Sequence, residues 1–221
     1  MEEIKVNRGE RLYKLYMIGS WGDLNSPQHI VVERDACIDM VLLVMPGVSC
    51  DVKLDVRLTG EGAEANIYGA YVCGSQERVK ISVDMHHDLP HCNSRQLFKG
   101  IAGGNSRVDF YGKIIVAQDA QRTEAYQENH NILLTDGAKV DTKPQLEIYA
   151  DDVKCSHGAT IGRLNEEEQF YMRSRGISLE DAKVLQMISF IAPVLENIPE
   201  ADREAVAVQF EDAIRNLVRN S

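Results

Sequence analysis

Apolar side chains recur at every second position along most of residues 30–161, and this alternation constrains the fold more than any other feature of the chain. A period of two places successive side chains on opposite faces of an extended strand, so the apolar set lines one face. The strands are short and are separated by turn-forming clusters, as at 58–62 and 103–106. This pattern predicts an all-β body. It leaves a sandwich, a barrel and a β-solenoid open, because no repeat of fixed length is evident.

After Gly162 the apolar period becomes that of a helix. Three helices are expected, and their start signals are Asn165 with Glu168, Ser178, and Pro199. Gly176 ends the first helix, and Pro193 should kink or end the second near Ala192. We therefore divide the chain into a β body of residues 1–162 and a helical segment of residues 163–221.

The expected helices carry apolar stripes that need to be covered. Two amphipathic helices cannot form a core alone, so they pack on the β body, on each other or on a partner protein. The large apolar side chains proposed to bind a partner are Phe170, Tyr171, Leu185, Ile188, Ile191 and Phe210.

Charge and cysteine content exclude several classes of protein. With 34 acidic and 24 basic residues the net charge is -10, which opposes binding to nucleic acid. Five cysteines without a CxxC pair indicate reduced thiols in a cytoplasmic protein. The amino terminus lacks the apolar core of a signal peptide, and the apolar run Val41–Met45 is far too short to span a membrane.

A thiol and an imidazole share one strand face near the end of the β body. Val153, Cys155, His157, Ala159 and Ile161 alternate with more polar neighbours, so all five side chains point the same way. Side chains two apart on a strand are roughly 6 to 7 Å apart, so Cys155 and His157 can help to hold a metal. Other ligands must come from elsewhere. On the residues alone, a structural role in the core is favoured for both.

A group of histidines and a cysteine at 86–92 is better explained by a structural role than by metal binding. His86, His87, His91 and Cys92 resemble a metal site, but Pro90 and the strand pattern argue against the helix that would bring His87 and His91 together. We favour structural roles for them.

Gln127, Asn129 and Asn131 lie on one strand face, where stacked amides commonly form hydrogen-bonded ladders. The chain contains no GxxxxGK[ST] loop, so it does not itself hydrolyse ATP.

Several segments together resemble a known family. They are 142–178, which contains CSHGAT followed by FYMRSRG, and the upstream stretches 86–100 and 108–142. These segments resemble the SufB/SufD family of iron–sulfur cluster assembly scaffolds, and they are more similar to the SufD side. The resemblance covers most of the chain beyond His86. We expect the amino-terminal helical region of the family to be missing here, so no role of that region is carried over.

The resemblance implies a right-handed parallel β-helix that acts as a non-catalytic scaffold of the SUF system. It implies that His157 takes part in building a nascent, transiently held iron–sulfur cluster at a subunit interface, together with a cysteine of the partner; Cys155 is a second candidate. It implies two partners: a SufC-like ABC-type ATPase, engaged by the tail helices, and a second β-helix. That second β-helix is a SufB-like subunit or another copy of this chain.

Two alternative functions stay open from the sequence. The first is a homodimeric β-helix module that has no cluster-assembly activity. The second is a polysaccharide-active β-helix enzyme, which would need paired carboxylates in a groove. Asp151 and Asp152 are adjacent in sequence and point to opposite faces, which counts against such a pair.

Overall fold

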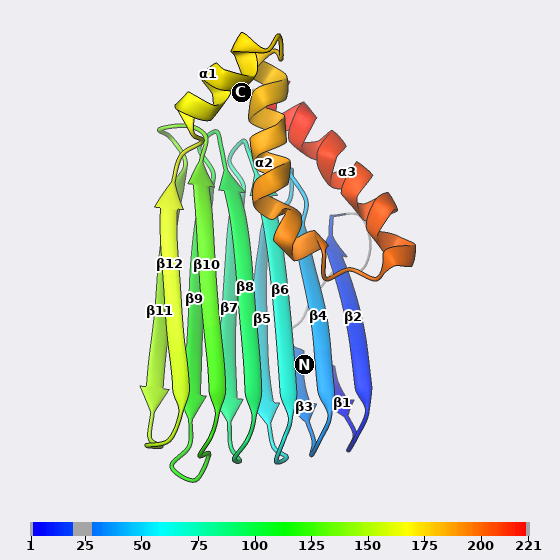
Figure 1. Cartoon of the computed structure of the whole chain (residues 1–221), viewed down its shortest axis with the longest axis vertical. Helices are drawn as coiled ribbons and strands as arrows, with labels where there is room; N and C mark the ends of the chain where they lie inside the picture. Colours follow the sequence, from blue (N-terminus) through cyan, green and yellow to red (C-terminus); the bar gives the residue numbers. More distant parts are fainter. Residues whose placement is uncertain (1, 20–27, 220–221) are drawn as a thin grey trace.

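The chain winds into a parallel β-helix with a helical segment packed against one side (Figure 1). The computed structural model describes residues 2–19 and 28–219. The strands are β1 (Glu2–Val6), β2 (Arg11–Ile18), β3 (Gln28–Val32), β4 (Cys37–Val44), β5 (Cys50–Leu58), β6 (Glu64–Cys73), β7 (Arg78–His87), β8 (Asn93–Ala102), β9 (Arg107–Val116), β10 (Glu124–Leu133), β11 (Lys139–Ile148) and β12 (Lys154–Gly162).

The strands form two six-stranded parallel sheets that face each other. Sheet A has the order β1-β3-β5-β7-β9-β11, and sheet B has the order β2-β4-β6-β8-β10-β12. Each turn of the helix therefore adds one strand to each sheet. Glu2 lies opposite Gln28, 26 residues later, whereas Arg107 lies opposite Lys139, 32 residues later. This drift in turn length explains why the sequence shows no fixed repeat. The predicted parallel β-helix is confirmed.

Alternate side chains of both sheets fill the interior of the rod. Ile30, Leu54 and Val83 are representative, each no more than 2% exposed. Two aromatic rings inside the rod lie over glycines of the adjacent strand in sheet B. A Cβ on Gly69 would lie 2.2 Å from the ring of Phe98, and a Cβ on Gly100 would lie 1.8 Å from the ring of Tyr71. The packing of these two rings therefore requires glycine at both positions.

The interior becomes polar in the later turns. Gln96, Gln127, Asn129 and Asn131 are each at most 2% exposed. Nε2 of Gln127 donates to Oε1 of Gln96 at 2.9 Å, and Nδ2 of Asn131 donates to Oδ1 of Asn129 at 2.8 Å. The hydroxyl of Tyr71 joins the two asparagines, because it donates to Asn131 and accepts from Asn129. The predicted amide ladder is confirmed, and it lies inside the rod.

The helical segment contains α1 (Glu166–Ser174), α2 (Leu179–Leu195) and α3 (Glu200–Arg219). The predicted cap of α1 is confirmed, since Oδ1 of Asn165 accepts from the backbone N–H groups of Glu167 and Glu168. Helix α2 continues through Pro193 and ends at Leu195, three residues beyond Ala192. Pro193 has no N–H to donate to the helix, and the helix ends two residues after it. Within the described residues, no helix combines the length and hydrophobicity needed to cross a membrane.

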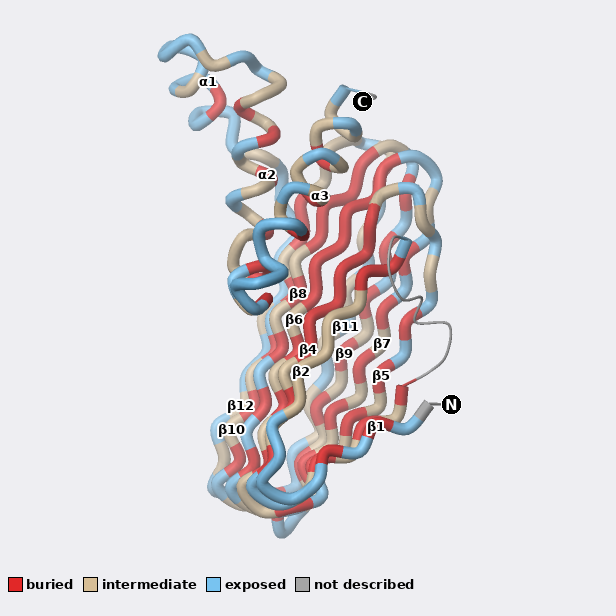
Figure 2. Tube along the Cα trace, turned by 90° about the vertical axis from the view of Figure 1, so that its right-hand side faces the viewer, coloured by how far each residue is buried: buried red, intermediate tan, exposed pale blue. Residues whose placement is uncertain are grey.

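Helices α2 and α3 pack on the outer face of sheet B, whereas α1 stands clear of the sheets (Figures 1 and 2). A second hydrophobic core fills this contact. From the sheet it takes Met17, Val41, Leu43, Ala70, Val72 and Ile101, and from the helices it takes Val184, Met187, Ile191, Val194, Val206, Phe210 and Ile214. The helical segment is therefore fixed to the β body by burial of apolar surface on both sides.

Candidate functional site

The last turn of the rod leaves strand edges and an interior face uncovered. Within the described residues, β11 pairs only with β9, and β12 only with β10. Each strand therefore has one edge whose backbone N–H and C=O groups face no neighbouring strand. Side chains that would be buried in an earlier turn are half-buried or exposed here. We call residues 139–162 the open end.

Cys155 and His157 both lie on β12, on the face that continues the interior of the rod. Cys155 is opposite Ala125 and packs against the main core, while His157 is opposite Gln127 and is exposed. Burial raises the pKa of the Cys155 thiol above its ordinary value, and a backbone hydrogen bond from Ala125 opposes that shift. At neutral pH the thiol is therefore protonated, and it would lose its proton on binding a metal.

Large apolar side chains also reach solvent at the open end. Ile148 is 39% exposed, Tyr149 64% and Ile161 45%. Ile148 and Ile161 follow the alternation of an ordinary buried strand, so their exposure could not be predicted from the sequence. The informative signal is that the alternation persists in the last turn, where no further turn follows to cover it. Exposed apolar side chains beside free strand edges are typical of a protein contact.

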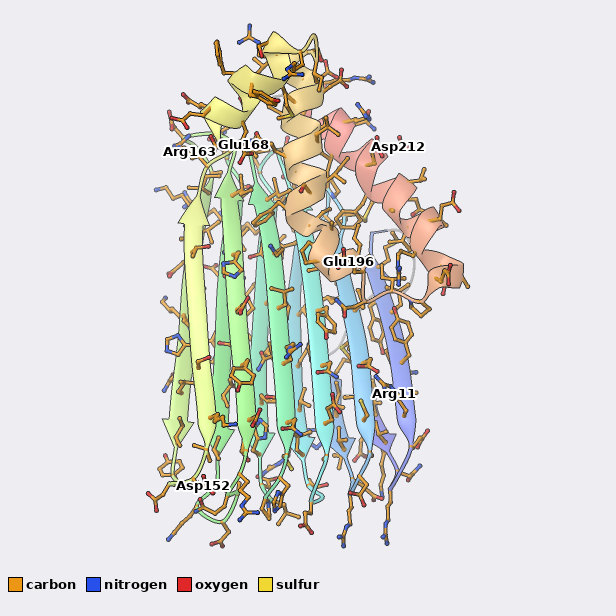
Figure 3. The ribbon with its side chains drawn as sticks, viewed as in Figure 1. Arg11, Asp152, Arg163, Glu168, Glu196 and Asp212 are labelled. Carbon is orange, nitrogen blue, oxygen red and sulfur yellow. The ribbon has the colours of Figure 1, made fainter. Side chains whose placement is uncertain are left out.

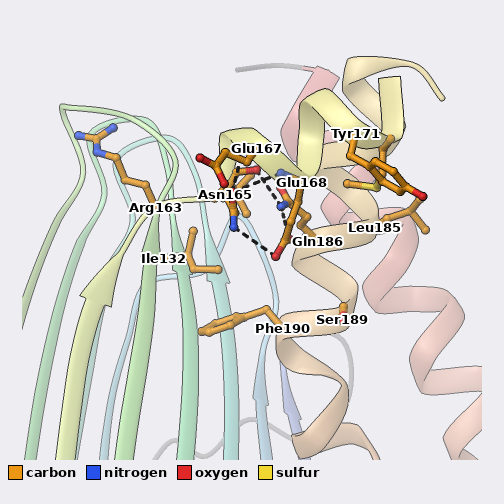
Figure 4. A pocket seen from close by; sticks show the side chains of 12 residues that line it. Ile132, Arg163, Asn165, Glu167, Glu168, Tyr171, Leu185, Gln186, Ser189 and Phe190 are labelled. Atoms are coloured by element: carbon orange, nitrogen blue, oxygen red, sulfur yellow. Dashed lines mark hydrogen bonds between the residues drawn. The ribbon is translucent and has the colours of Figure 1, made fainter. Parts of the chain in front are cut away.

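A second exposed apolar surface lies on the helical segment. Phe170 and Tyr171 on α1 are 73% and 59% exposed, and Leu185 on α2 is 45% exposed. The guanidinium of Arg175 lies 5.1 Å from the ring centre of Tyr171. Tyr171 and Leu185 line a groove of about 890 Å³ between α1, α2 and the end of β10 (Figure 4). Its lining includes Ile132, Leu164, Glu168, Tyr171, Gln186 and Phe190.

Hydrogen bonds hold the two helices that form this groove. Nε2 of Gln186 on α2 donates to Oε2 of Glu168 on α1 at 2.7 Å and to the backbone carbonyl of Asn165 at 3.0 Å (Figure 4). Nδ2 of Asn165 donates to Oε1 of Glu168 at 3.3 Å. The groove is thus a built feature of the fold, and its walls are set by residues from both helices.

Three of the predicted partner-binding residues are more buried than Phe170, Tyr171 and Leu185. Ile191 and Phe210 are at most 1% exposed and belong to the core between the helices and sheet B. Ile188 is partly buried against the same core. These side chains pack the helices onto the β body, so Ile191 and Phe210 offer no surface to a partner in this arrangement.

His86, His87 and Cys92 have partners within the fold, whereas His91 is exposed in the turn before β8. His87 is fully buried beside Ser94, with 2.9 Å between Nε2 and Oγ. His86 lies 3.4 Å from a carboxylate oxygen of Asp55, and the buried thiol of Cys92 donates to the backbone carbonyl of Gly60. Across the residues that the structure describes, no three or more His, Cys, Asp or Glu side chains are placed to hold a metal ion.

Asp151 and Asp152, the carboxylates considered for a polysaccharide-cleaving enzyme, are both exposed and lie between β11 and β12. Asp152 is highly exposed and lies 3.7 Å from the guanidinium of Arg122. It sits at the end of the rod opposite Arg163 and Glu168 (Figure 3). A glycoside hydrolase needs two carboxyl groups across one groove.

Comparison with known proteins identifies the family of the chain. Residues 23–190 match the protein family described as "SUF system FeS cluster assembly, SufBD core domain". The chain belongs to the SufBD core family. The matched range contains most of the β-helix, the whole open end, α1 and much of α2. The predicted resemblance to SufB and SufD is confirmed.

Several curated relatives of the SufBD core family are similar to the chain. It is 45% identical over 167 residues to the iron-sulfur cluster assembly protein SufD of Escherichia coli (strain K12), covering 76% of the chain and 40% of that protein. It is 29% identical over 223 residues to a SufBD family protein of Mycobacterium tuberculosis, covering 95% of the chain and 56% of the relative. A SufBD family protein of Synechocystis is 46% identical over 112 residues, which cover 51% of the chain and 25% of the relative.

The chain thus matches between 25% and 56% of the length of these three relatives.

Proposed function

We propose that the chain is a non-enzymatic scaffold on which iron–sulfur clusters are assembled at the open end. The observation that carries this proposal is the last turn itself. There, in a member of the SufBD core family, exposed apolar side chains, free strand edges and His157 occur together. The cluster is the cargo of this site and is held only transiently.

The open end suits pairing with a second β-helix. Free edges of β11 and β12 offer backbone hydrogen bonds to another strand, and the exposed apolar side chains offer surface to bury. The partner is a SufB-like subunit or a second copy of this chain. Pairing would place His157 in the seam between the two subunits.

The chemistry of His157 and Cys155 suits iron, because imidazole and thiolate are both ligands of iron–sulfur sites. Two side chains on one strand do not complete a coordination sphere, and no complete metal-ligand group occurs in the described part of the chain. The remaining ligands would come from the paired subunit. His157 is the principal ligand of the proposal, and Cys155 is the second.

The helical segment is proposed to bind an ABC-type ATPase resembling SufC, in which ATP hydrolysis takes place. The exposed residues Phe170, Tyr171 and Leu185, with the adjoining edge of Ile188, form the docking surface. Residues 1–162 and 163–221 would then have separate roles, the first in pairing and the second in binding the ATPase. Movement of the ATPase subunits would shift the paired rods and open the seam to iron and sulfur.

The role of His157 predicts a loss of cluster assembly without a loss of folding. His157→Ala, in complex with the paired β-helix subunit, should lower the iron and labile sulfide retained after anaerobic reconstitution about tenfold or more. His130→Ala is the matched control, because His130 lies on the neighbouring strand but hydrogen-bonds on the outer face to Thr160. An undiminished yield in His157→Ala would remove this residue from the site. A stable homodimer that assembles no cluster would favour the alternative of an interaction module.

The role of the helices predicts a separable defect in complex formation. Replacing Phe170 and Tyr171 by Ala should abolish co-elution with the ATPase, because two exposed aromatic side chains are lost from the contact. Size-exclusion chromatography with light scattering measures the mass of the complex. Val208→Ala, which removes exposed apolar surface from α3 instead, should leave the complex intact. Equal binding by all variants would show that the ATPase binds a different surface of the protein.

A further inference from the structure

The amide ladder inside the rod leads directly to His157. Ile67, Gln96, Gln127 and His157 are paired register positions in four successive turns of sheet B. The first three are buried, and His157 is exposed because it lies in the last turn. The position that follows the ladder is thus occupied by the imidazole of the proposed site.

The ladder has a direction that leaves one acceptor facing the open end. Nε2 of Gln127 donates to Oε1 of Gln96, so both amides present nitrogen toward the earlier turns and oxygen toward the later ones. At the inner limit, Nε2 of Gln96 has no partner, since the preceding position is the apolar Ile67. At the outer limit, the buried Oε1 of Gln127 has no partner either. A buried carbonyl without a donor is costly.

Sheet A holds the Gln127 side chain in place. A Cβ on Gly112 of β9 would lie 2.3 Å from Nε2 and 2.7 Å from Oε1 of Gln127. The amide therefore reaches across the interior and lies against the bare backbone of Gly112. With the hydrogen bond to Gln96 on one side and this close contact on the other, the carbonyl has little freedom to turn away.

We propose that Gln127 is a positioning residue for His157. Its carbonyl oxygen accepts a hydrogen bond from one ring N–H of the imidazole, which leaves the other ring nitrogen unprotonated and directed outward. The inference rests on the proposed function, in which that outer nitrogen binds iron. Histidines that bind metals almost always donate their second N–H to a carboxylate, a backbone carbonyl or water, and the side-chain carbonyl of Gln127 would serve the same purpose; this fixes the tautomer and the orientation of the ring.

Long-range proton–nitrogen NMR of ¹⁵N-histidine-labelled full-length protein tests this directly, because it reports the tautomer of each ring. The His157 signals are assigned by their loss in His157→Ala. The wild-type ring should adopt one tautomer, and Gln127→Leu, which lacks an acceptor, should give a mixture. Gln127→Glu keeps an acceptor oxygen and should restore the single tautomer. Thr142→Val is the matched control, since the buried Thr142 hydroxyl is another unpartnered group in the last turn.

A wild-type tautomer pattern in Gln127→Leu, or a mixture already present in wild type, overturns the proposal. If Gln127→Leu does not fold, as judged by circular dichroism, Gln127→Asn withdraws the carbonyl by one methylene and should give the same mixture. Cluster yield should fall about tenfold or more in Gln127→Leu and recover in Gln127→Glu. A single tautomer set by Gln127, combined with cluster assembly that does not need His157, would reject the proposed function alone.

Discussion

His87 is the one imidazole that the described structure encloses completely. It is 0% exposed, its Nε2 lies beside Ser94, and its Nδ1 has no partner. Burial lowers the pKa of His87 to about 4, although the nearby carboxylate of Asp88 acts in the opposite direction. The ring is therefore neutral in the folded chain throughout the physiological range.

This burial makes stability depend on pH. Below about pH 6.5 the unfolded chain binds a proton at His87 that the folded chain does not bind until about pH 4. The free energy of unfolding should therefore decrease by roughly 3 kcal/mol as the pH falls through this window. Urea denaturation at a series of pH values measures it. His87→Gln should lack this component, and identical pH profiles for the two proteins would contradict the prediction.

Individual residues differ in how far the sequence alone could place them. The alternation around Cys155 and His157 correctly put both on the inward face of a strand, and stacked amides at Gln127, Asn129 and Asn131 predicted the ladder. The exposure of His157 could not be derived from alternation. An inward position is buried in every turn except the last, and a strand pattern does not say which turn is last.

At the scale of elements, sheet B is unusual in being apolar on part of its outer face. Val41, Leu43, Val72 and Ile101 point away from the interior of the rod and are nonetheless buried, because α2 and α3 cover them. Phe210 of α3 is the largest helical side chain that is fully buried in this contact. The contact should account for most of the stability of the helical segment.

Removing the Phe210 ring should therefore be costly. We expect Phe210→Ala to lower the free energy of unfolding by about 3 to 5 kcal/mol, through lost burial and the cavity left behind. Val208→Ala, at an exposed position of the same helix, should change it by less than about 0.5 kcal/mol. Chemical denaturation of the two variants under the same conditions measures the difference. Equal, small effects would show that the helices do not depend on sheet B.

The positions of strands and helices followed well from periodicity and capping residues, but their packing did not. Apolar helical side chains such as Ile188, Ile191 and Phe210 could pack on a sheet of the same chain or on a partner protein, and the sequence does not distinguish the two. The discriminating signal was in the strands, where Val41 and Leu43 break the polar half of the alternation. The strand residues and the helical residues are far apart in sequence, and only the three-dimensional structure shows that they pack together.

At the scale of the whole molecule, backbone hydrogen bonds join each turn of sheet only to its neighbours, so order should vary along the rod. Turns in the middle are bonded on both sides, whereas β11 and β12 are bonded on one. In dilute protein, peptides from 139–162 should exchange amide hydrogen with deuterium faster than peptides from 64–102, as measured by mass spectrometry. The contrast should diminish in the presence of a paired subunit. Equal protection in the two regions at every concentration would contradict the open end.

The helices follow the last turn in sequence, yet their core reaches back to β2, β4, β6 and β8. A pull on α2 is therefore distributed over strands from several turns and does not load the final turn alone. Under such a load we expect the turns to move together, because the load is not concentrated on the backbone hydrogen bonds of a single turn.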